Sequence, residues 1–177
     1  MKIAVLAIAA ASLYASAALA LPVVTYVQQT PLYKPSTVQA AGFNVEMHGT
    51  PGGSAGAVIA GLHGPAWTGG TALEILPADA KPGKGTRLVL VFNGAGAPGE
   101  TACTNPDALG GAAATTGSAL RVLAVYCAGD RMIARGALSA GPEAMPGSED
   151  YRDAMQSLLD AMFPPQNTNI SPLGGGI

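Results

Sequence analysis

The stretch LRVLAVYCAGDRMIARGALS, residues 120–139, holds two apolar runs around a short polar turn. The first run, residues 120–127, has the length and the β-branched and aromatic content of a buried strand. Residues 128–130 read Ala-Gly-Asp, a tight turn, so residues 132–139 are expected to return beside the first run as its antiparallel partner. The chain is therefore predicted to be built around a β-sheet.

Three further segments are predicted strands. The sequence FNVEM at residues 43–47 alternates apolar and polar side chains, which is typical of a half-buried strand. Residues 71–76 and the apolar RLVLVF at residues 87–92 flank a turn rich in proline, glycine and lysine, so they are expected to form a hairpin. The segment that follows, residues 93–118, is rich in small and polar residues and is expected to be a long loop.

Two helices are predicted, each beginning after a serine. The Ser54 hydroxyl can cap a short helix over residues 55–62, which Gly64 ends. Ser148 can cap a longer helix, which two prolines end at residues 164 and 165. The apolar side chains of the longer helix recur at helical spacing, which predicts that one face packs on the sheet. They are Tyr151, Met155, Leu158, Leu159 and Met162.

These elements predict an α+β fold: an antiparallel or mixed sheet of about five strands, with one short helix and one longer C-terminal helix packed on it as a two-layer sandwich. Residues 42–163 are expected to form the single α+β domain. Residues 21–41 are an extended lead-in, in which residues 23–27 could pair as a strand and the prolines at 31 and 35 prevent any regular element after it. Residues 164–177 are expected to be a disordered tail.

The N-terminus has the parts of a secretory signal peptide, predicted over residues 1–20. Lys2 supplies a positive charge, an apolar run follows, and Ala18-Leu19-Ala20 is a small-residue cleavage site. The alternative is an uncleaved membrane anchor, but alanine is weakly hydrophobic and Pro22 interrupts the run. The sequence therefore predicts export to the periplasm or the extracellular space of a bacterium, without stable membrane insertion after cleavage.

Cys103 and Cys127 are the two cysteines of the chain. In an exported protein such a pair favours a disulfide. A redox pair or a metal site is the alternative; redox cysteines normally lie two residues apart, and a metal site would need neighbouring ligands. A structural disulfide is therefore expected.

The low charge content and the context of the glycine motif argue against nucleic-acid binding and against a bound cofactor. Charged residues make up 11% of the chain, against about 25% in a typical protein. Lys81, Lys84 and Arg87 are the only local basic cluster and are expected in a solvated loop, so no nucleic-acid surface is predicted. Residues 94–99 match G-x-G-x-x-G, but no amphipathic helix follows, so no dinucleotide cofactor is expected.

Ser54 also lies in a G-x-S-x-G pattern, GGSAG at residues 52–56, which is typical of serine hydrolases. A nucleophile needs a histidine base, and His48 and His63 are the candidates. However, His63 lies at the far end of the helix that Ser54 would cap, and the predicted strand ends well before Ser54. The interpretation of Ser54 as a helix cap is therefore favoured.

A metal site is the other chemistry weighed. Glu46 and His48 lie two residues apart and share one face of a strand, and His63 could supply a third ligand. A polar strand face explains Glu46 and His48 more simply. The sequence thus predicts an exported, non-enzymatic accessory or binding module of the cell envelope, with an envelope protein as one candidate partner. The alternative is a small serine hydrolase that uses Ser54 with His48 or His63.

Overall fold

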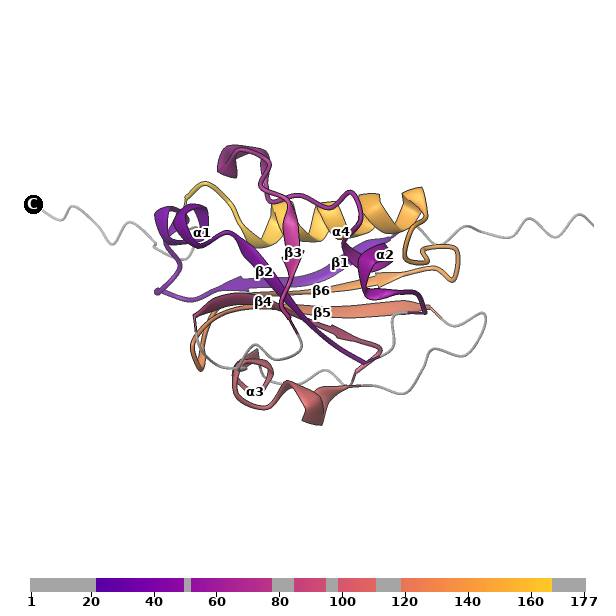
Figure 1. Ribbon diagram of the computed structural model, residues 1–177, viewed down its shortest axis with the longest axis horizontal. Helices are drawn as coiled ribbons and strands as arrows, with labels where there is room; N and C mark the ends of the chain where they lie inside the picture. The colour runs from indigo at the N-terminus through magenta and orange to yellow at the C-terminus, as the bar shows by residue number, and fades with distance from the viewer. Residues whose placement is uncertain (1–21, 50–51, 78–84, 95–98, 111–118, 167–177) are drawn as a thin grey trace, which may run out of the picture.

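A six-stranded mixed sheet forms the middle of the molecule, with helices on both of its faces (Figure 1). The computed structural model describes residues 22–49, 52–77, 85–94, 99–110 and 119–166. The strands are β1 (Val23–Gln29), β2 (Phe43–His48), β3 (Leu73–Ile75), β4 (Thr86–Phe92), β5 (Leu120–Ala128) and β6 (Arg131–Ala140). The helices are α1 (Pro35–Ala41), α2 (Ala55–Ile59), α3 (Gly99–Thr104) and α4 (Glu149–Met162), and two 3₁₀ turns are η1 (Ala66–Thr68) and η2 (Pro106–Leu109). The predicted α+β class is confirmed.

The order of the strands across the sheet is β1-β6-β5-β4-β2-β3. The predicted hairpin of β5 and β6 is confirmed: the two strands pair antiparallel and turn at Gly129, which has a positive φ of 56°. A residue with a side chain rarely adopts that backbone conformation, so glycine suits the turn. β4 pairs antiparallel with the other edge of β5 and completes the buried centre of the sheet.

The hairpin predicted between residues 71–76 and 87–92 is wrong. β2 lies between β3 and β4 and pairs parallel with both, so β3 and β4 run in the same direction. Val45 lies opposite Ile75 on one side and Leu88 on the other. Two apolar strands around a turn resemble a hairpin in sequence, but a third strand from earlier in the chain occupies the position between them.

Residues 21–41 are only partly as predicted. The strand suggested at residues 23–27 is present as β1, which pairs with β6 at the edge of the sheet, but Pro35 begins helix α1 instead of preventing a regular element. Proline is tolerated in the first turn of a helix, where its missing N–H would have no helical acceptor. The buried side chain of Val38 joins α1 to the main core.

The larger of two cores lies between the sheet and a layer made by α1, α2 and α4 (Figure 1). The predicted apolar stripe of α4 is buried in it, and the Ser148 hydroxyl accepts a hydrogen bond from the Tyr151 N–H at 3.1 Å, so both predictions for this helix are confirmed. Helix α2 ends at Ile59, three residues before its predicted end. The rings of Tyr126 and Phe163 pack edge to face in this core, with a centroid distance of 5.1 Å.

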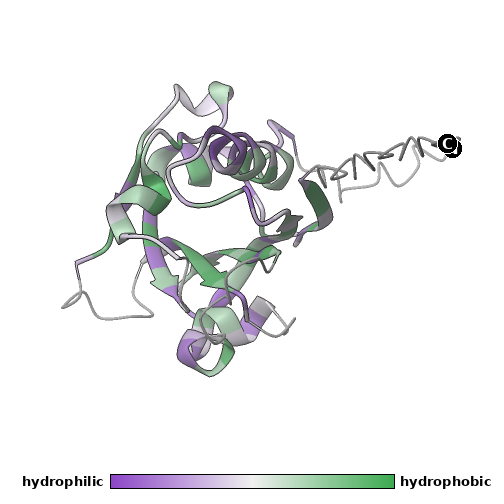
Figure 2. Ribbon diagram, turned by 90° about the vertical axis from the view of Figure 1, so that its right-hand side faces the viewer, coloured by the Kyte–Doolittle hydropathy of each residue, from purple (hydrophilic) through white to green (hydrophobic). Residues whose placement is uncertain are grey.

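A smaller core lies between the opposite face of the sheet and a layer formed by α3 and η2. Figure 2 shows this layer below the sheet. Residues 93–118 were expected to be a loop, but both elements lie within that segment. They add a layer to the predicted sandwich. The predicted disulfide is confirmed: Cys103 of α3 is bonded to Cys127 of β5, with both side chains buried. It ties the added layer to the sheet.

The ends of the chain are described only in part. The predicted signal peptide lies outside the described residues, as do residues 167–177 of the predicted tail. Pro164, the first residue of that predicted tail, is tied to the domain, because its carbonyl oxygen accepts a hydrogen bond from the Tyr33 hydroxyl. Among the described residues, no helix has the length and the apolar character required to cross a membrane.

Candidate functional site

Ser54 caps helix α2, as predicted. Its side-chain oxygen accepts a hydrogen bond from the Ala57 N–H at 3.2 Å, and the residue is exposed. Within the described ranges, no hydrogen bond joins Ser54 to His48 or to His63. The hydrolase hypothesis therefore has no contact between nucleophile and base to support it.

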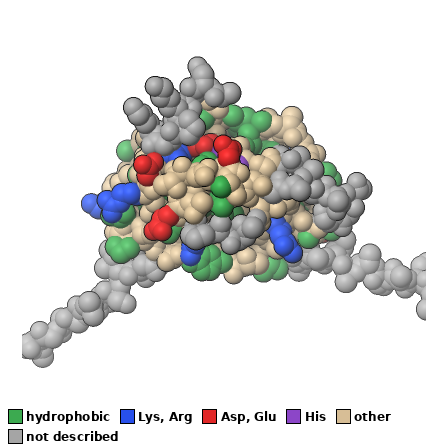
Figure 3. Space-filling view, turned by 90° about the horizontal axis from the view of Figure 1, so that it is seen from below, with side chains coloured by type: hydrophobic (Ala, Val, Ile, Leu, Met, Phe, Trp, Pro, Cys, Tyr) green, Lys and Arg blue, Asp and Glu red, His purple; other side chains and the backbone are tan. Residues whose placement is uncertain are grey.

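His48 lies between two carboxylates instead. Its Nε2 is 2.8 Å from Oε1 of Glu46, its neighbour on the same face of β2, and its Nδ1 is 2.8 Å from Oδ1 of Asp107 on η2. An ionised carboxylate only accepts hydrogen bonds, so each ring nitrogen that carries a proton can donate one. The Asp107 side chain is exposed, whereas those of His48 and Glu46 are mostly covered. On this face of the molecule, acidic side chains gather next to a histidine (Figure 3).

Arg87 completes this group, and its place corrects a prediction. It was expected in a solvated loop with Lys81 and Lys84, but its side chain is buried, while the two lysines lie outside the described residues. The guanidinium has three acceptors: Nε donates to Oε2 of Glu46 at 2.5 Å, Nη1 to the carbonyl oxygen of Gly129 at 3.0 Å, and Nη2 to that of Cys103 at 2.7 Å. A buried cation needs such partners. We call Glu46, His48, Arg87 and Asp107 the charged cluster.

The charged cluster joins the sheet to the α3–η2 layer. Asp107 belongs to η2, and Arg87 reaches the backbone of α3. The role of Asp107 was missed from the sequence because 59 positions separate it from His48, and no local pattern marks such a contact. In the described part of the chain, no group of three or more histidine, cysteine, aspartate or glutamate side chains is arranged to hold a metal ion. His63, the third metal candidate, lines a cavity beside α4.

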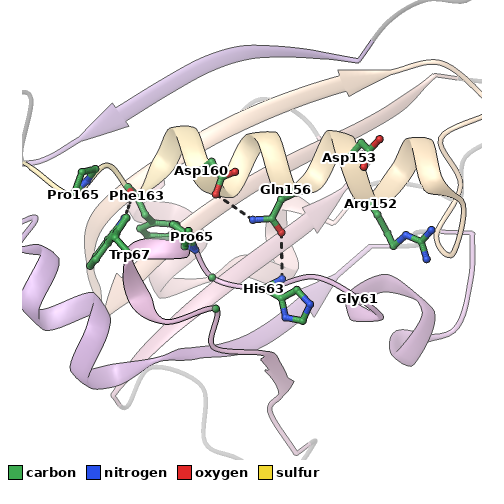
Figure 4. A pocket seen from close by; sticks show the side chains of 13 residues that line it. Gly61, His63, Pro65, Trp67, Arg152, Asp153, Gln156, Asp160, Phe163 and Pro165 are labelled. Atoms are coloured by element: carbon green, nitrogen blue, oxygen red, sulfur yellow. Dashed lines mark hydrogen bonds between the residues drawn. The ribbon is translucent and has the colours of Figure 1, made fainter.

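That cavity is a groove between α4 and the loop that contains η1 (Figure 4). Its volume is about 840 Å³, within the range of small-ligand sites. We call it the α4 groove. It is lined by Gly61, His63, Gly64, Pro65, Ala66, Trp67, Gly70, Arg152, Asp153, Gln156, Asp160, Phe163 and Pro165.

Two hydrogen bonds join the walls of the α4 groove, and a third lies within the α4 wall (Figure 4). The indole N–H of Trp67 donates to the carbonyl oxygen of Phe163 at 2.7 Å. The backbone N–H of His63 donates to Oε1 of Gln156 at 3.3 Å, and Nε2 of Gln156 donates to Oδ1 of Asp160 at 3.1 Å. Both the oxygen and the nitrogen of the Gln156 side-chain amide are therefore hydrogen-bonded, which fixes this side chain between the loop and α4.

The charged side chains of the α4 groove come from one helix. Arg152, Asp153 and Asp160 are exposed on α4. All the ion pairs found among the described residues belong to the charged cluster, so these three side chains have no ionic partner there. The groove thus combines aromatic and proline surface with carboxylates that can still accept hydrogen bonds. The sequence indicated only an exposed polar face on this helix and did not indicate the loop that faces it.

Comparison with known proteins adds no relative. No protein-family model matches the chain, and no match was found among curated proteins or solved structures. The geometry of the two sites therefore carries the functional argument.

Proposed function

We propose that the protein is exported and acts as a non-enzymatic binding module of the cell envelope, with the α4 groove as its ligand site. The groove carries this proposal. It has the volume of a ligand site, an aromatic side chain at one end and charged groups along one wall.

Two observations support export. The Cys103–Cys127 disulfide is of the kind that persists in oxidising compartments. The first twenty residues have the charge, the apolar run and the cleavage site of a signal peptide. The expected product in the envelope begins at Leu21 and has no free thiol.

The bracing of the α4 groove supports binding. Trp67 is fixed by its hydrogen bond to Phe163, and Gln156 links the loop to α4. Side chains held in place before a ligand arrives lose less conformational entropy when it binds. A groove built in this way suits ligand recognition, which requires no catalytic nucleophile.

Site-specific photo-cross-linking in intact cells tests the proposal. A photoreactive phenylalanine derivative replaces Arg152 in the groove or, as the control, Ser157, which is exposed on α4 but does not line the groove. We expect adducts with an envelope component from position 152 and far fewer from position 157. Equal yields at the two positions would remove the groove from the proposal. Recovery of the uncleaved chain from the cytosol with two alkylatable thiols would remove export.

A further inference from the structure

We infer that the α4 groove binds a cationic ligand, namely a lysine- or arginine-containing peptide segment of a partner protein. The inference rests on the proposed function and names the chemistry of the ligand for the same site. It depends on the positions of Trp67 on η1 and of Asp153 and Asp160 on α4, all of which line the groove.

The hydrogen bond of Trp67 determines which part of its ring a ligand can contact. Its only polar hydrogen already points to the Phe163 carbonyl oxygen. A ligand therefore meets indole carbon surface, whose π electrons attract a positive charge. The aliphatic part of a lysine or arginine side chain can pack on the same surface and on Pro165, which also lines the groove.

The carboxylates of the groove supply the opposite charge. Asp160 receives one hydrogen bond from Gln156, which leaves acceptor positions on the carboxylate for a ligand. Asp153 lies seven residues earlier on the same side of α4, about 10 Å away along the helix axis. Neither forms an ion pair within the described residues. A ligand ammonium or guanidinium would make charge-assisted hydrogen bonds with them.

Arg152 makes the two ends of the groove differ in charge. It lines the end away from Trp67, close to Gly61, and repels a cation there. His63 is the remaining titratable side chain of the groove and lies on the opposite wall, with Gln156 bonded to its backbone. The site for the cation is therefore the end formed by Trp67 and Asp160. An uncharged apolar ligand would instead cover the carboxylates without giving them a partner, which is unfavourable.

The chain contains one tryptophan, Trp67, so its fluorescence reports on this groove alone. The probe is the blocked peptide acetyl-Ala-Lys-Ala-Lys-Ala-amide, titrated into the mature full-length protein. The same peptide with glutamine or glutamate in place of lysine is the ligand control. We expect a saturable fluorescence change with the lysine peptide only. Binding should weaken as salt rises from about 0.05 to 0.5 M, because exposed charges are increasingly screened over that range.

Variants locate the interaction. Asp160→Asn should weaken binding of the lysine peptide about three- to tenfold. Asp153→Asn should have a smaller effect. Glu149→Gln removes a carboxylate from the first turn of the same helix, outside the groove, and should leave the affinity unchanged. Circular dichroism of each variant confirms that it is folded.

The inference is overturned if the lysine peptide gives no saturable change, if the glutamine peptide binds as well, or if Asp160→Asn binds as tightly as the parent protein. Each of these results leaves the proposed function open to its own test. If position 152 cross-links in cells but the lysine peptide does not bind, the groove binds a ligand of another chemistry. Loss of that cross-linking would count against the groove itself.

Discussion

Arg87 lies directly opposite Cys127 in the pairing of β4 with β5, and its guanidinium donates a hydrogen bond to the carbonyl oxygen of Cys103, the residue to which Cys127 is disulfide-bonded. One covalent bond and one buried cation therefore hold the same point of α3. Arg87 also forms an ion pair with Glu46, which contacts His48, and His48 in turn contacts Asp107. The layer formed by α3 and η2 is thus held to the sheet at Cys103 of α3 and at Asp107 of η2.

Replacing Arg87 with methionine should destabilise the protein strongly. The variant keeps an unbranched apolar chain in the buried space but leaves the carboxylate of Glu46 without its cation. Because the Glu46 side chain is 12% exposed, we expect a loss of roughly 2–4 kcal/mol, somewhat below the range for a fully buried broken pair. Urea denaturation at neutral pH measures the free energy of unfolding.

The double variant Arg87→Met with Glu46→Gln is the control for that experiment. It removes both charges, so it should be more stable than Arg87→Met alone. If the single variant unfolds at the same urea concentration as the parent protein, the ion pair contributes nothing to the attachment of the layer.

Removing the disulfide should lower the free energy of unfolding by a similar amount. The two cysteines are 24 positions apart, and the chain-entropy model gives about 3–4 kcal/mol for a loop of that size. The variant Cys103→Ala with Cys127→Ala should therefore show an earlier urea midpoint. Mass spectrometry after alkylation without reductant should find no free thiol in the parent protein isolated from cells, and two modified thiols there would refute the bridge.

Alkaline conditions should destabilise the protein through its buried tyrosines. Burial raises the pKa of Tyr33 from the ordinary value of 10.0 to about 12. The unfolded chain then releases this proton at a lower pH than the folded protein does. The stabilisation is complete below pH 10, declines as the pH rises, and is lost above about pH 12. Burial raises the pKa of Tyr126 and of Tyr151 as well, in the same direction.

Tyr33→Phe isolates one of these contributions. The variant loses the hydrogen bond to Pro164, so its stability at pH 7 should be lower. Its further loss between pH 10 and pH 12 should be smaller than that of the parent protein, because position 33 no longer titrates in this range. Urea midpoints at a series of pH values measure the slope. Equal slopes for the two proteins would contradict the role given to Tyr33.

Ser54→Ala separates the cap from the nucleophile. Loss of the hydrogen bond to the Ala57 N–H should cost about 1 kcal/mol. Ser54→Asp can still cap the helix and should retain most of the stability, although it cannot act as a hydroxyl nucleophile. A chromogenic ester assay on all three proteins completes the test. Ester hydrolysis by the parent protein that both variants lose would favour the serine hydrolase alternative.

Elements with a strong local pattern could be predicted from the sequence. The hairpin of β5 and β6 has two long apolar runs and a glycine at its turn, and α4 has a capping serine with a full apolar stripe. Cys103 and Cys127 had no other cysteine with which to pair. In each case the residues that determine the structure are neighbours in sequence or have a single partner.

The remaining features depend on contacts between distant segments. Helix α3 has six residues, too few for a helical period to be recognised, and it is held by the disulfide and by Arg87. Arg87 appeared solvated because lysines lie nearby in sequence, but its acceptors come from β2, α3 and the turn after β5. The α4 groove likewise needs a loop placed beside a helix from much later in the chain. His63 and Gln156, which are hydrogen-bonded across it, lie 93 positions apart.

The position of β1 affects the order in which the strands of the sheet can pair. Val23 is paired with Ser139, and Gln29 donates a hydrogen bond to the Met162 carbonyl oxygen at the end of α4. A polypeptide threaded N-terminus first through a translocation channel, as proposed here, would deliver its leading strand long before the strand beside which it must dock. The edge position beside β6 would then be filled only after β6 and α4 had crossed as well, so the native sheet would close late in export.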